Sequence, residues 1–201
     1  MFNWFFQHTK RPEGFWGRVM LKGMNKGHAS ISNWGMSYLD LKKDYVVLDV
    51  GCGGGANIKE FLKKCSEGFV YGIDYSKDSV EISKRLNKES LNKNCEIKEG
   101  NVMDLPYEDN CMDIVNAFET VYFWPDLNKG FKEVYRVLKQ GGKFLIVCEG
   151  SDPSNTKWTS IIEGMTLRSG EQLKQELINE GFKNIKLFKK EKEWITLISE
   201  K

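Results

Sequence analysis

Residues 46–57 read VVLDVGCGGGAN, and this stretch decides the fold of the chain. Its first five residues form a short apolar run that predicts a buried strand, and the glycines that follow predict a turn into a helix. Because glycine has no Cβ, such a turn adopts backbone angles closed to other residues and lets a ligand approach the main chain. The stretch therefore predicts a strand, a glycine loop and a helix that hold a ligand containing a nucleoside.

Two acidic residues accompany this loop. Asp49 lies inside the apolar run, where burial of a carboxylate is costly unless loop amides or a ligand amine supply hydrogen bonds. Asp74 ends a second apolar run, residues 69–74, about 25 residues further on, where nucleotide-binding folds place a carboxylate on ribose hydroxyls. Asp74 is therefore predicted to contact the ligand, and a role as cap of the helix that opens at Ser76 is a simpler alternative.

The glycine-rich turn alone does not identify the ligand. Residues 51–56 also fit the Gly-x-Gly-x-x-Ala pattern of a dinucleotide fold. Tyr135 and Lys139 have the spacing of a short-chain dehydrogenase pair, so a nicotinamide-dependent oxidoreductase is a rival hypothesis. The position of Tyr135 counts against it, because this residue lies in the predicted helix before the fifth strand and not after that strand.

The composition favours one domain without a polyanionic partner. The chain has 201 residues, and a hydrophobic content of 40% is sufficient to cover a twisted sheet on both faces. The 30 basic and 28 acidic side chains give a net charge of +2, so nucleic acid is not favoured as a partner. The basic stretch 183–192 alternates with apolar residues, as the solvent-facing side of an edge strand does.

Five cysteines are scattered along the chain without a Cys-x-x-Cys pair, and the chain has only two histidines. This pattern argues against a structural zinc site, and we predict no bound metal. Thiols in or beside apolar strands, such as Cys111 and Cys148, fit a reducing cytoplasm. Residues 1–6 are too short for a signal peptide, and no run approaches the roughly 20 apolar residues that span a bilayer. We therefore expect a cytoplasmic protein without membrane insertion.

Strands and helices are predicted to alternate after residue 46. Such alternation favours a parallel sheet with right-handed crossovers, helices on both faces and ligands at the carboxyl ends of the strands. The chain closes with a helix and two alternating strands that form a hairpin. The predicted strands are 46–50, 69–74, 95–98, 112–118, 143–148, 183–188 and 194–198, and the predicted helices are 16–24, 29–41, 57–64, 76–91, 128–138 and 170–180.

These elements predict an α/β fold: a Rossmann-like, doubly wound, seven-stranded sheet with a C-terminal antiparallel hairpin, in three αβα layers. We expect one domain with an N-terminal helical cap (1–42), a cofactor-binding core (43–150), a substrate-side connection (151–169) and a last helix with the hairpin (170–201). Long connections beside a site often form lids or substrate walls.

Four motifs, in order, resemble those of the class I S-adenosylmethionine-dependent methyltransferases, in particular the small single-domain, methyltransferase type 11-like group. Residues 47–55 resemble the first motif of the family, 72–76 the second, 100–115 the third and 134–143 the approach to strand five. The resemblance implies S-adenosyl-L-methionine as cofactor and S-adenosyl-L-homocysteine as product.

The resemblance also implies positions for the parts of the cofactor. The backbone of the glycine loop would lie along the methionine part of the cofactor. Asp74 would accept hydrogen bonds from both ribose hydroxyls, and Tyr75 would lie against the adenine. Asn101 and Val102 match the pair beside the adenine amino edge, although many relatives have Asp at the first position. Asp104 is explained as readily by formation of a turn before Leu105 and Pro106 as by contact with the cofactor. The predicted cofactor-binding residues are Asp49, Gly51, Cys52, Gly53, Asp74, Tyr75, Asn101, Val102, Phe118 and Glu119.

The family brings the acceptor to the end of strand 112–118. Rings at 122–124 would form part of its pocket, although each ring alone could be core. Residues 27–34 resemble a leader that folds over the cofactor in some small-molecule members, and its histidine is either a base, a cofactor contact or a simple helix cap. The predicted catalytic residues are His28, Glu119 and Tyr122, and the predicted substrate-pocket residues are Trp16, Trp34, Tyr122, Phe123 and Trp124.

The resemblance implies methyl transfer by direct in-line displacement, without a metal. A small-molecule acceptor is favoured by the balanced charge, the aromatic wall and the lack of an appended nucleic-acid module. RNA and protein are alternative acceptors, and a cofactor-binding protein without catalysis is a further alternative. A general base is needed only if the acceptor must lose a proton.

Overall fold

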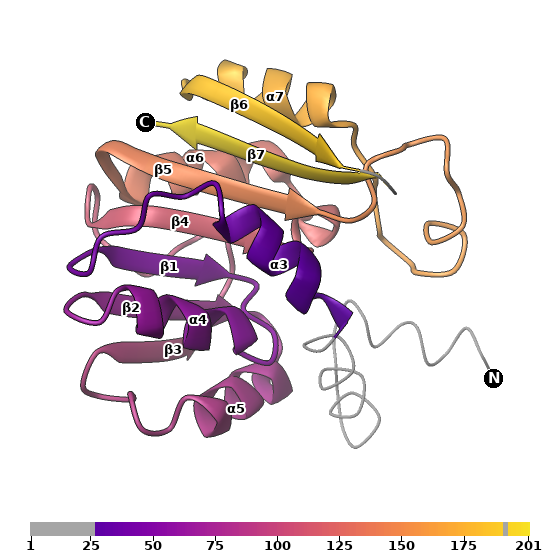
Figure 1. Cartoon of the computed structure of the whole chain (residues 1–201). Helices are drawn as coiled ribbons and strands as arrows, with labels where there is room; N and C mark the ends of the chain where they lie inside the picture. The colour runs from indigo at the N-terminus through magenta and orange to yellow at the C-terminus, as the bar shows by residue number, and fades with distance from the viewer. Residues whose placement is uncertain (1–26, 191–192) are drawn as a thin grey trace.

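Seven strands form one sheet in the order β3-β2-β1-β4-β5-β7-β6 (Figure 1). The computed structural model describes residues 27–190 and 193–201. Strands β1 to β5 are parallel, and β7 runs antiparallel to both of its neighbours. This arrangement confirms the predicted fold. The strands are β1 (Val46–Val50), β2 (Phe69–Asp74), β3 (Cys95–Glu99), β4 (Met112–Phe118), β5 (Leu138–Cys148), β6 (Lys183–Lys190) and β7 (Trp194–Glu200).

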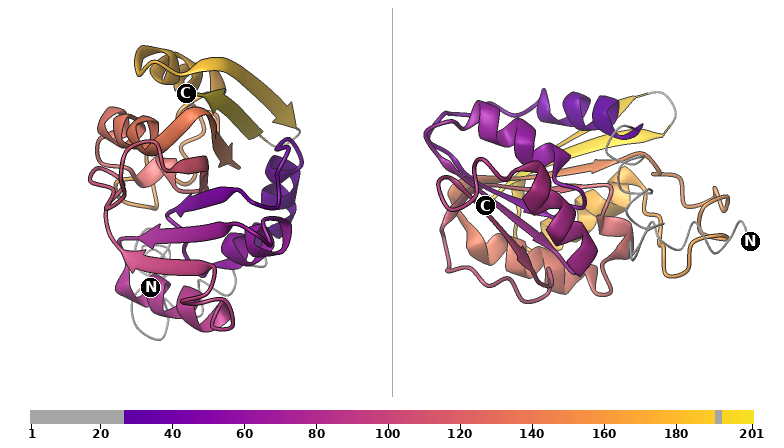
Figure 2. Two further views of the ribbon diagram at one scale, coloured as in Figure 1. Left: turned by 90° about the vertical axis from the view of Figure 1, so that its left-hand side faces the viewer. Right: turned by 90° about the horizontal axis from the view of Figure 1, so that it is seen from below.

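Helices cover both faces of the sheet (Figure 2). The apolar faces of the first three pack into one buried cluster with β1, and those of the last two pack into a second cluster on the opposite face. Both clusters follow from the buried apolar runs of the central strands, which face helices on both sides. The helices are α3 (Ala29–Met36), α4 (Ala56–Lys64) and α5 (Lys77–Leu86) on one face, α6 (Leu127–Val137) and α7 (Gly170–Asn179) on the other, and the short 3-10 helix η1 (Val121–Phe123) after β4.

Two helices end earlier than predicted. The helix predicted for 29–41 ends at Met36, and Leu39 continues the buried apolar pattern from a turn. The helix predicted for 76–91 ends at Leu86, because the Asn87 side chain donates to the carbonyl oxygens of Ser83 and of the glycine loop. In both cases apolar residues continue at helical spacing beyond the end of the helix, so the sequence pattern predicted a helix that was too long.

The end of the chain matches the prediction of a hairpin. Residues 183–190 of the basic stretch form β6, an edge strand whose side chains are largely exposed or half-buried, as their alternation indicated. Strand β5 begins five residues earlier than predicted, at Leu138, with irregular pairing to β4 around Met112. The arrowheads of β1 and β5 in Figure 1 point to the edge of the sheet from which residues 151–168 extend.

The described residues bear on the predictions about the cysteines and about membrane-spanning segments. All five cysteines lie in the described part of the chain and are free thiols. Across residues 27–190 and 193–201 we find no helical segment with the length and hydrophobicity that a bilayer span requires. The predicted helix at 16–24 lies outside the described residues.

Candidate functional site

The glycine loop joins β1 to α4 and is fastened to the end of β2. The amides of Gly51 and Cys52 both donate to the carbonyl oxygen of Ile73, at 2.8 and 3.1 Å. Gly51 has a φ of +71°, a left-handed conformation that side chains disfavour, and a Cβ there would overlap the side chain of Thr120. The first glycine of the loop is therefore required by both its conformation and its neighbour.

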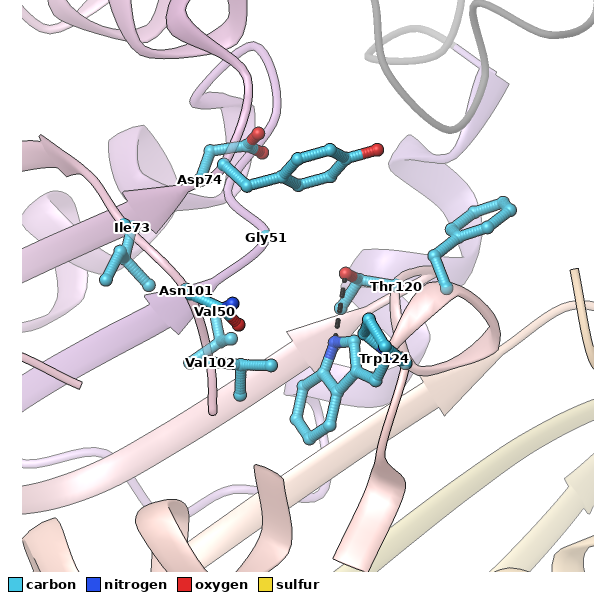
Figure 3. Close-up of a pocket in the computed structure, with 12 residues that line it drawn as sticks. Val50, Gly51, Ile73, Asp74, Asn101, Val102, Thr120 and Trp124 are labelled. Carbon is cyan, nitrogen blue, oxygen red and sulfur yellow. Dashed lines mark hydrogen bonds between the residues drawn. The ribbon is translucent and has the colours of Figure 1, made fainter. Parts of the chain in front are cut away.

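A cavity opens beside this loop at the carboxyl ends of β1, β2 and β4 (Figure 3). It encloses about 590 Å³, counting the part that is open to solvent. In Figure 3, Asp74, Gly51 and Asn101 lie on one side and Thr120 and Trp124 lie on the other. The lining residues are Val50, Gly51, Ile73, Asp74, Tyr75, Gly100, Asn101, Val102, Thr120, Phe123, Trp124 and Pro125.

Asp74 fixes the polar end of the cavity. Its side chain accepts hydrogen bonds from the amide of Gly53 at 2.8 Å and from the amide of Ser76 at 2.9 Å, one on each oxygen. Burial raises its pKa, and these amides oppose the shift. Ser76, not Asp74, is the N-cap of α5. Because each carboxylate oxygen accepts more than one hydrogen bond, Asp74 keeps capacity for a ligand.

Asp49 is the second buried carboxyl group at the loop. It is only 1% exposed, and its Oδ2 atom has no hydrogen-bond partner among the described residues. The loop amides that were expected to satisfy it donate instead to Ile73 and Asp74. Burial, with a contribution from the nearby Asp74, raises the pKa of Asp49 to about 8. A buried acceptor without a partner is unfavourable in the free protein, so a ligand donor is the expected partner.

Residues that follow β2 and β3 form a further part of the cavity lining. Tyr75, which is 39% exposed, belongs to the lining together with Asn101 and Val102. The Asn101 side-chain oxygen accepts the amide of Met103 at 3.0 Å, so its amide nitrogen remains available as a donor. This part of the lining offers a ring, an amide and an apolar surface.

The three predicted catalytic residues converge at the ends of β4 and β5. Glu119 follows β4 directly, with a φ of +57°, and its carboxylate accepts a hydrogen bond from the amide of Glu149. The Tyr122 hydroxyl lies 3.4 Å from Glu119 and accepts the amide of Gly150 at 3.0 Å. His28, at the N-cap of α3 but without a side-chain cap, lies 4.0 Å from Glu149. Glu149 was missed, although its place directly after a central parallel strand was a usable signal.

Comparison with known proteins identifies the family. The family described as "Methyltransferase domain" matches residues 48–146, from β1 to near the end of β5, including the whole glycine loop. The chain belongs to the class I S-adenosylmethionine-dependent methyltransferases. S-adenosyl-L-methionine is accordingly its cofactor.

Individual relatives agree in fold. The uncharacterized methyltransferase YcgJ of Bacillus subtilis is 28% identical over 151 residues, which cover 67% of this chain and 59% of the relative. The demethylmenaquinone methyltransferase of Lactococcus lactis is 37% identical over 110 residues, which cover 54% of this chain and 43% of the relative. A solved SAM-dependent methyltransferase from Aquifex aeolicus has a TM-score of 0.76 at 19% identity, covering 90% of this chain and 96% of that one. The chain spans about half the length of the curated relatives it matches.

The residues present fit this cofactor. Gly51 exposes main chain where a Cβ has no room, Asp74 has spare acceptor capacity for hydroxyl groups, and Asp49 has an unsatisfied acceptor for an amine. The adenosyl part requires an apolar surface as well, which Ile73 and Val102 provide in the lining.

Two predicted cofactor residues turn their side chains into the core. The Cys52 thiol is buried near the Ser83 hydroxyl, which leaves only its backbone for the cofactor, as the prediction assumed. The Phe118 ring packs at 6.3 Å from Phe61 and does not line the cavity. Successive side chains of a strand point to opposite faces of the sheet, so Phe118 faces α4 and the next residue faces away from α4.

Of the five predicted substrate-pocket residues, two line the cavity. Phe123 and Trp124 line the cavity, and the Trp124 indole donates to the Thr120 hydroxyl at 3.4 Å. Tyr122 is buried in the core behind Glu119 and does not line the cavity. Trp34 packs on Tyr38 and Trp194 at the outer face of the sheet, away from the lining, and Trp16 lies outside the described residues. Thr120 was not predicted, although it lies between the end of strand 112–118 and the rings at 122–124, where the acceptor was expected.

Replacement of Gly51 tests the loop geometry. We expect Gly51→Ala to destabilise the protein by about 2–4 kcal/mol, since a left-handed conformation costs about 1–2 kcal/mol and the contact with Thr120 adds to it. Urea unfolding measures this change. Gly141→Ala is the matched control, because Gly141 has a φ of +76° with nothing within 4 Å of an added Cβ. Equal losses in the two variants would show that the Thr120 contact is unimportant.

The raised pKa of Asp49 predicts a pH dependence of stability. The Asp49 carboxyl group binds its proton more tightly in the folded protein, where its pKa is about 8, than in the unfolded chain, where its pKa is near 4. Its contribution to the stability of the fold is therefore lost as the pH rises from about 4 to about 8. We expect the free energy of unfolding to fall with pH over this range, and Asp49→Asn to reduce the slope by up to about 1.4 kcal/mol per pH unit. Urea unfolding of the cofactor-free protein between pH 5 and 8 measures it. Exposed Asp40→Asn is the control, and identical slopes for wild type and Asp49→Asn would contradict the assignment.

Proposed function

We propose that this chain transfers a methyl group from S-adenosylmethionine to a small-molecule acceptor by direct in-line displacement. The observation that carries the proposal is the cavity of Figure 3, which has Asp74 and the Gly51 backbone on one side and Trp124 on the other, and whose lining also includes the Phe123 ring. A concave, largely apolar site with a few polar groups is typical of small-ligand binding.

The proposed residue roles follow from these positions. Asp74 accepts the ribose hydroxyls, Asp49 accepts the methionine amine, and the main chain at Gly51 lies along the methionine part. Tyr75 and Val102 contact the adenine, and the Asn101 amide donates to a ring nitrogen of adenine. These contacts hold the cofactor in one orientation at the ends of the strands.

When bound, the cofactor supplies an electrophilic methyl group on a sulfonium centre. The protein supplies orientation, since holding the acceptor in line with that methyl group converts an encounter into a near-unimolecular step. Glu119 and His28 are the proposed proton acceptors where the acceptor must lose a proton, and Tyr122 is a positioning residue that holds Glu119.

The proposal of a small acceptor has support from a relative as well as from the cavity. The Lactococcus lactis relative is named for methylation of demethylmenaquinone, a small molecule. The near-neutral charge of the chain does not favour a polyanion such as RNA. RNA and protein acceptors stay as alternatives for the acceptor assay.

The oxidoreductase alternative is not supported by the positions of its two key residues. Tyr135 packs edge-on against Phe182 at 5.2 Å, and the Lys201 ammonium lies 4.9 Å above its ring. Lys139 forms an ion pair with Asp113 at 2.8 Å. Both residues are committed to packing and ion pairs on α6 and at the start of β5, and neither lines the cavity.

Two experiments test the proposal. Calorimetric titration with S-adenosylhomocysteine and with NADH should show binding of the first and weaker or no binding of the second. Incubation with methyl-labelled S-adenosylmethionine and a panel of amines, thiols, phenols and RNA should then label a small molecule. Preference for NADH would refute methyl transfer, labelling of RNA alone would refute the small-molecule acceptor, and no labelling would favour a non-catalytic binding protein.

A further inference from the structure

A cluster of hydrogen-bond acceptors lies beside the proposed cofactor site. His28, Glu119 and Glu149 come from the N-cap of α3, the end of β4 and the end of β5, and their acceptor atoms all lie within 4.8 Å of one another. The sheet register brings the two glutamates together, because Phe118 pairs with Val147 in neighbouring parallel strands. We call these three residues the acceptor cluster.

Within residues 27–190 and 193–201, no lysine or arginine forms an ion pair with the acceptor cluster. Among the described residues, neither Glu119 nor Glu149 forms an ion pair with lysine or arginine, and the nearest basic side chain recorded is His28 at 4.0 Å. Burial lowers the pKa of His28, which favours the neutral imidazole, although Glu149 opposes the shift. Burial raises the pKa of Glu119 to about 8; the hydrogen bond from the Glu149 amide opposes this shift, and the Glu149 carboxylate adds to it to a smaller extent. A cation bound at the cluster would favour the ionised form of Glu119, because a nearby positive charge lowers the pKa of a carboxyl group.

The spacing of the cluster distinguishes between kinds of cation. Three acceptors placed tetrahedrally around an ammonium nitrogen at about 2.8 Å lie roughly 4.6 Å apart. Around a divalent metal at about 2.1 Å, the same atoms lie roughly 3.0–3.4 Å apart. The His28 to Glu149 distance of 4.0 Å is longer than the spacing around a metal at 2.1 Å, and no pair in the set is more than 4.8 Å apart, so an ammonium group fits without the closure that such a metal requires.

The cluster is joined to the acceptor side of the cavity along the chain, although its three residues are not among those that line the cavity. Glu119 directly precedes Thr120, and Thr120, Phe123 and Trp124 line the cavity. The cavity residues that follow Glu119 along the chain therefore offer apolar and aromatic surface for the rest of an ammonium compound. Aromatic faces also attract cations.

We infer that the methyl acceptor is a primary or secondary amine, bound as its ammonium form between Glu119, Glu149 and His28. This inference rests on the proposed methyl transfer and names the class of acceptor. Glu149 is a newly assigned specificity residue, and it is 54% exposed, so its substitution leaves the core intact.

The chemical step then balances as follows. The ammonium nitrogen gives one proton to the Glu119 carboxylate or to the His28 imidazole, which restores its lone pair. That lone pair forms the new N–C bond to the methyl carbon while the C–S bond breaks and its electron pair stays on sulfur. The products are an N-methylammonium and the neutral thioether S-adenosylhomocysteine.

The test begins with the cofactor site, so that the two proposals fail separately. S-adenosylhomocysteine is titrated first, and its binding supports the cofactor site independently of the acceptor. In its presence, calorimetry then compares 2-phenylethylammonium with 2-phenylethanol, and 1,4-diaminobutane with 1,4-butanediol. We expect at least one ammonium compound to bind, its alcohol counterpart to bind at least tenfold more weakly, and the bound amine to be N-methylated by labelled cofactor.

The variants test the residues. Glu149→Gln is expected to weaken binding of the ammonium compound by about tenfold while leaving S-adenosylhomocysteine binding unchanged. Glu89→Gln, an exposed glutamate distant in sequence from the cluster, is the matched control and should change neither.

Four outcomes would overturn the inference. These are normal S-adenosylhomocysteine binding with no binding of either ammonium compound, equal binding of amine and alcohol, an unchanged amine affinity in Glu149→Gln, and stoichiometric binding of Mn²⁺ that Glu149→Gln abolishes. The last would identify a metal site in place of an amine site. Failure of S-adenosylhomocysteine itself to bind would refute the proposed function, and the inference with it.

Discussion

Asp74→Ala is expected to weaken the binding of S-adenosylhomocysteine by roughly 10- to 100-fold. The proposed contacts are hydrogen bonds from two ribose hydroxyls to a buried, charged acceptor, and such bonds contribute about 1.5–3 kcal/mol. The carboxylate is held in place by the amides of Gly53 and Ser76, so little orientation is lost on binding. Isothermal titration calorimetry measures the change directly.

Asp74 also supports the loop, and the experiment must separate the two effects. Removal of its carboxylate leaves the amides of Gly53 and Ser76 without their partner, which lowers stability as well as affinity. The titration is therefore performed at a temperature where circular dichroism shows the variant folded. Asp40→Ala, at an exposed aspartate, is the matched control. An unchanged dissociation constant in folded Asp74→Ala would refute the ribose contact.

Phe131→Ala is expected to have the largest effect on stability, a loss of about 3–5 kcal/mol. Phe131 is fully buried on α6, and its ring meets those of Trp124 and Phe144 edge-on at 5.9 and 5.7 Å. The substitution removes apolar contact and leaves a cavity that the rigid sheet cannot fill. For a chain of this size the midpoint of thermal unfolding should fall by roughly 6–20 °C.

The same substitution links the core to the site. Trp124 lies between Phe131 and the cavity, so loss of the Phe131 ring should loosen a residue of the acceptor wall. Urea unfolding monitored by tryptophan fluorescence measures the stability change. Ile178→Ala, at a residue that is 47% exposed on α7, should change stability by less than about 0.5 kcal/mol. A loss below about 1 kcal/mol in Phe131→Ala would contradict the packing described for this layer.

The sequence predicted well those features that depend on neighbouring residues. The strand, glycine loop and helix of residues 46–64 were placed within a residue or two, because apolar periodicity and glycine act locally. The end of β2 at Asp74 followed from the same short-range pattern. The order of alternating elements then determined the parallel sheet and the edge at which the cavity lies.

Features that depend on long-range pairing were not predictable. Whether an aromatic residue after β4 faces the cavity or the core depends on the turn at Glu119, whose positive φ is not encoded by a glycine. This turn buries Tyr122 and leaves Phe123 and Trp124 in the lining. The approach of Glu149 to Glu119 depends on the register between β4 and β5, which no local pattern specifies.

The central claim is that Asp74 and the glycine loop hold the adenosyl part of the cofactor at the carboxyl edge of the sheet. A crystal structure with S-adenosylhomocysteine tests it most directly. We expect the ribose hydroxyls within hydrogen-bond distance of Asp74, and the methionine part along the main chain at Gly51. Density for the ligand elsewhere, or side chains of the lining closed over the cavity, would contradict the claim.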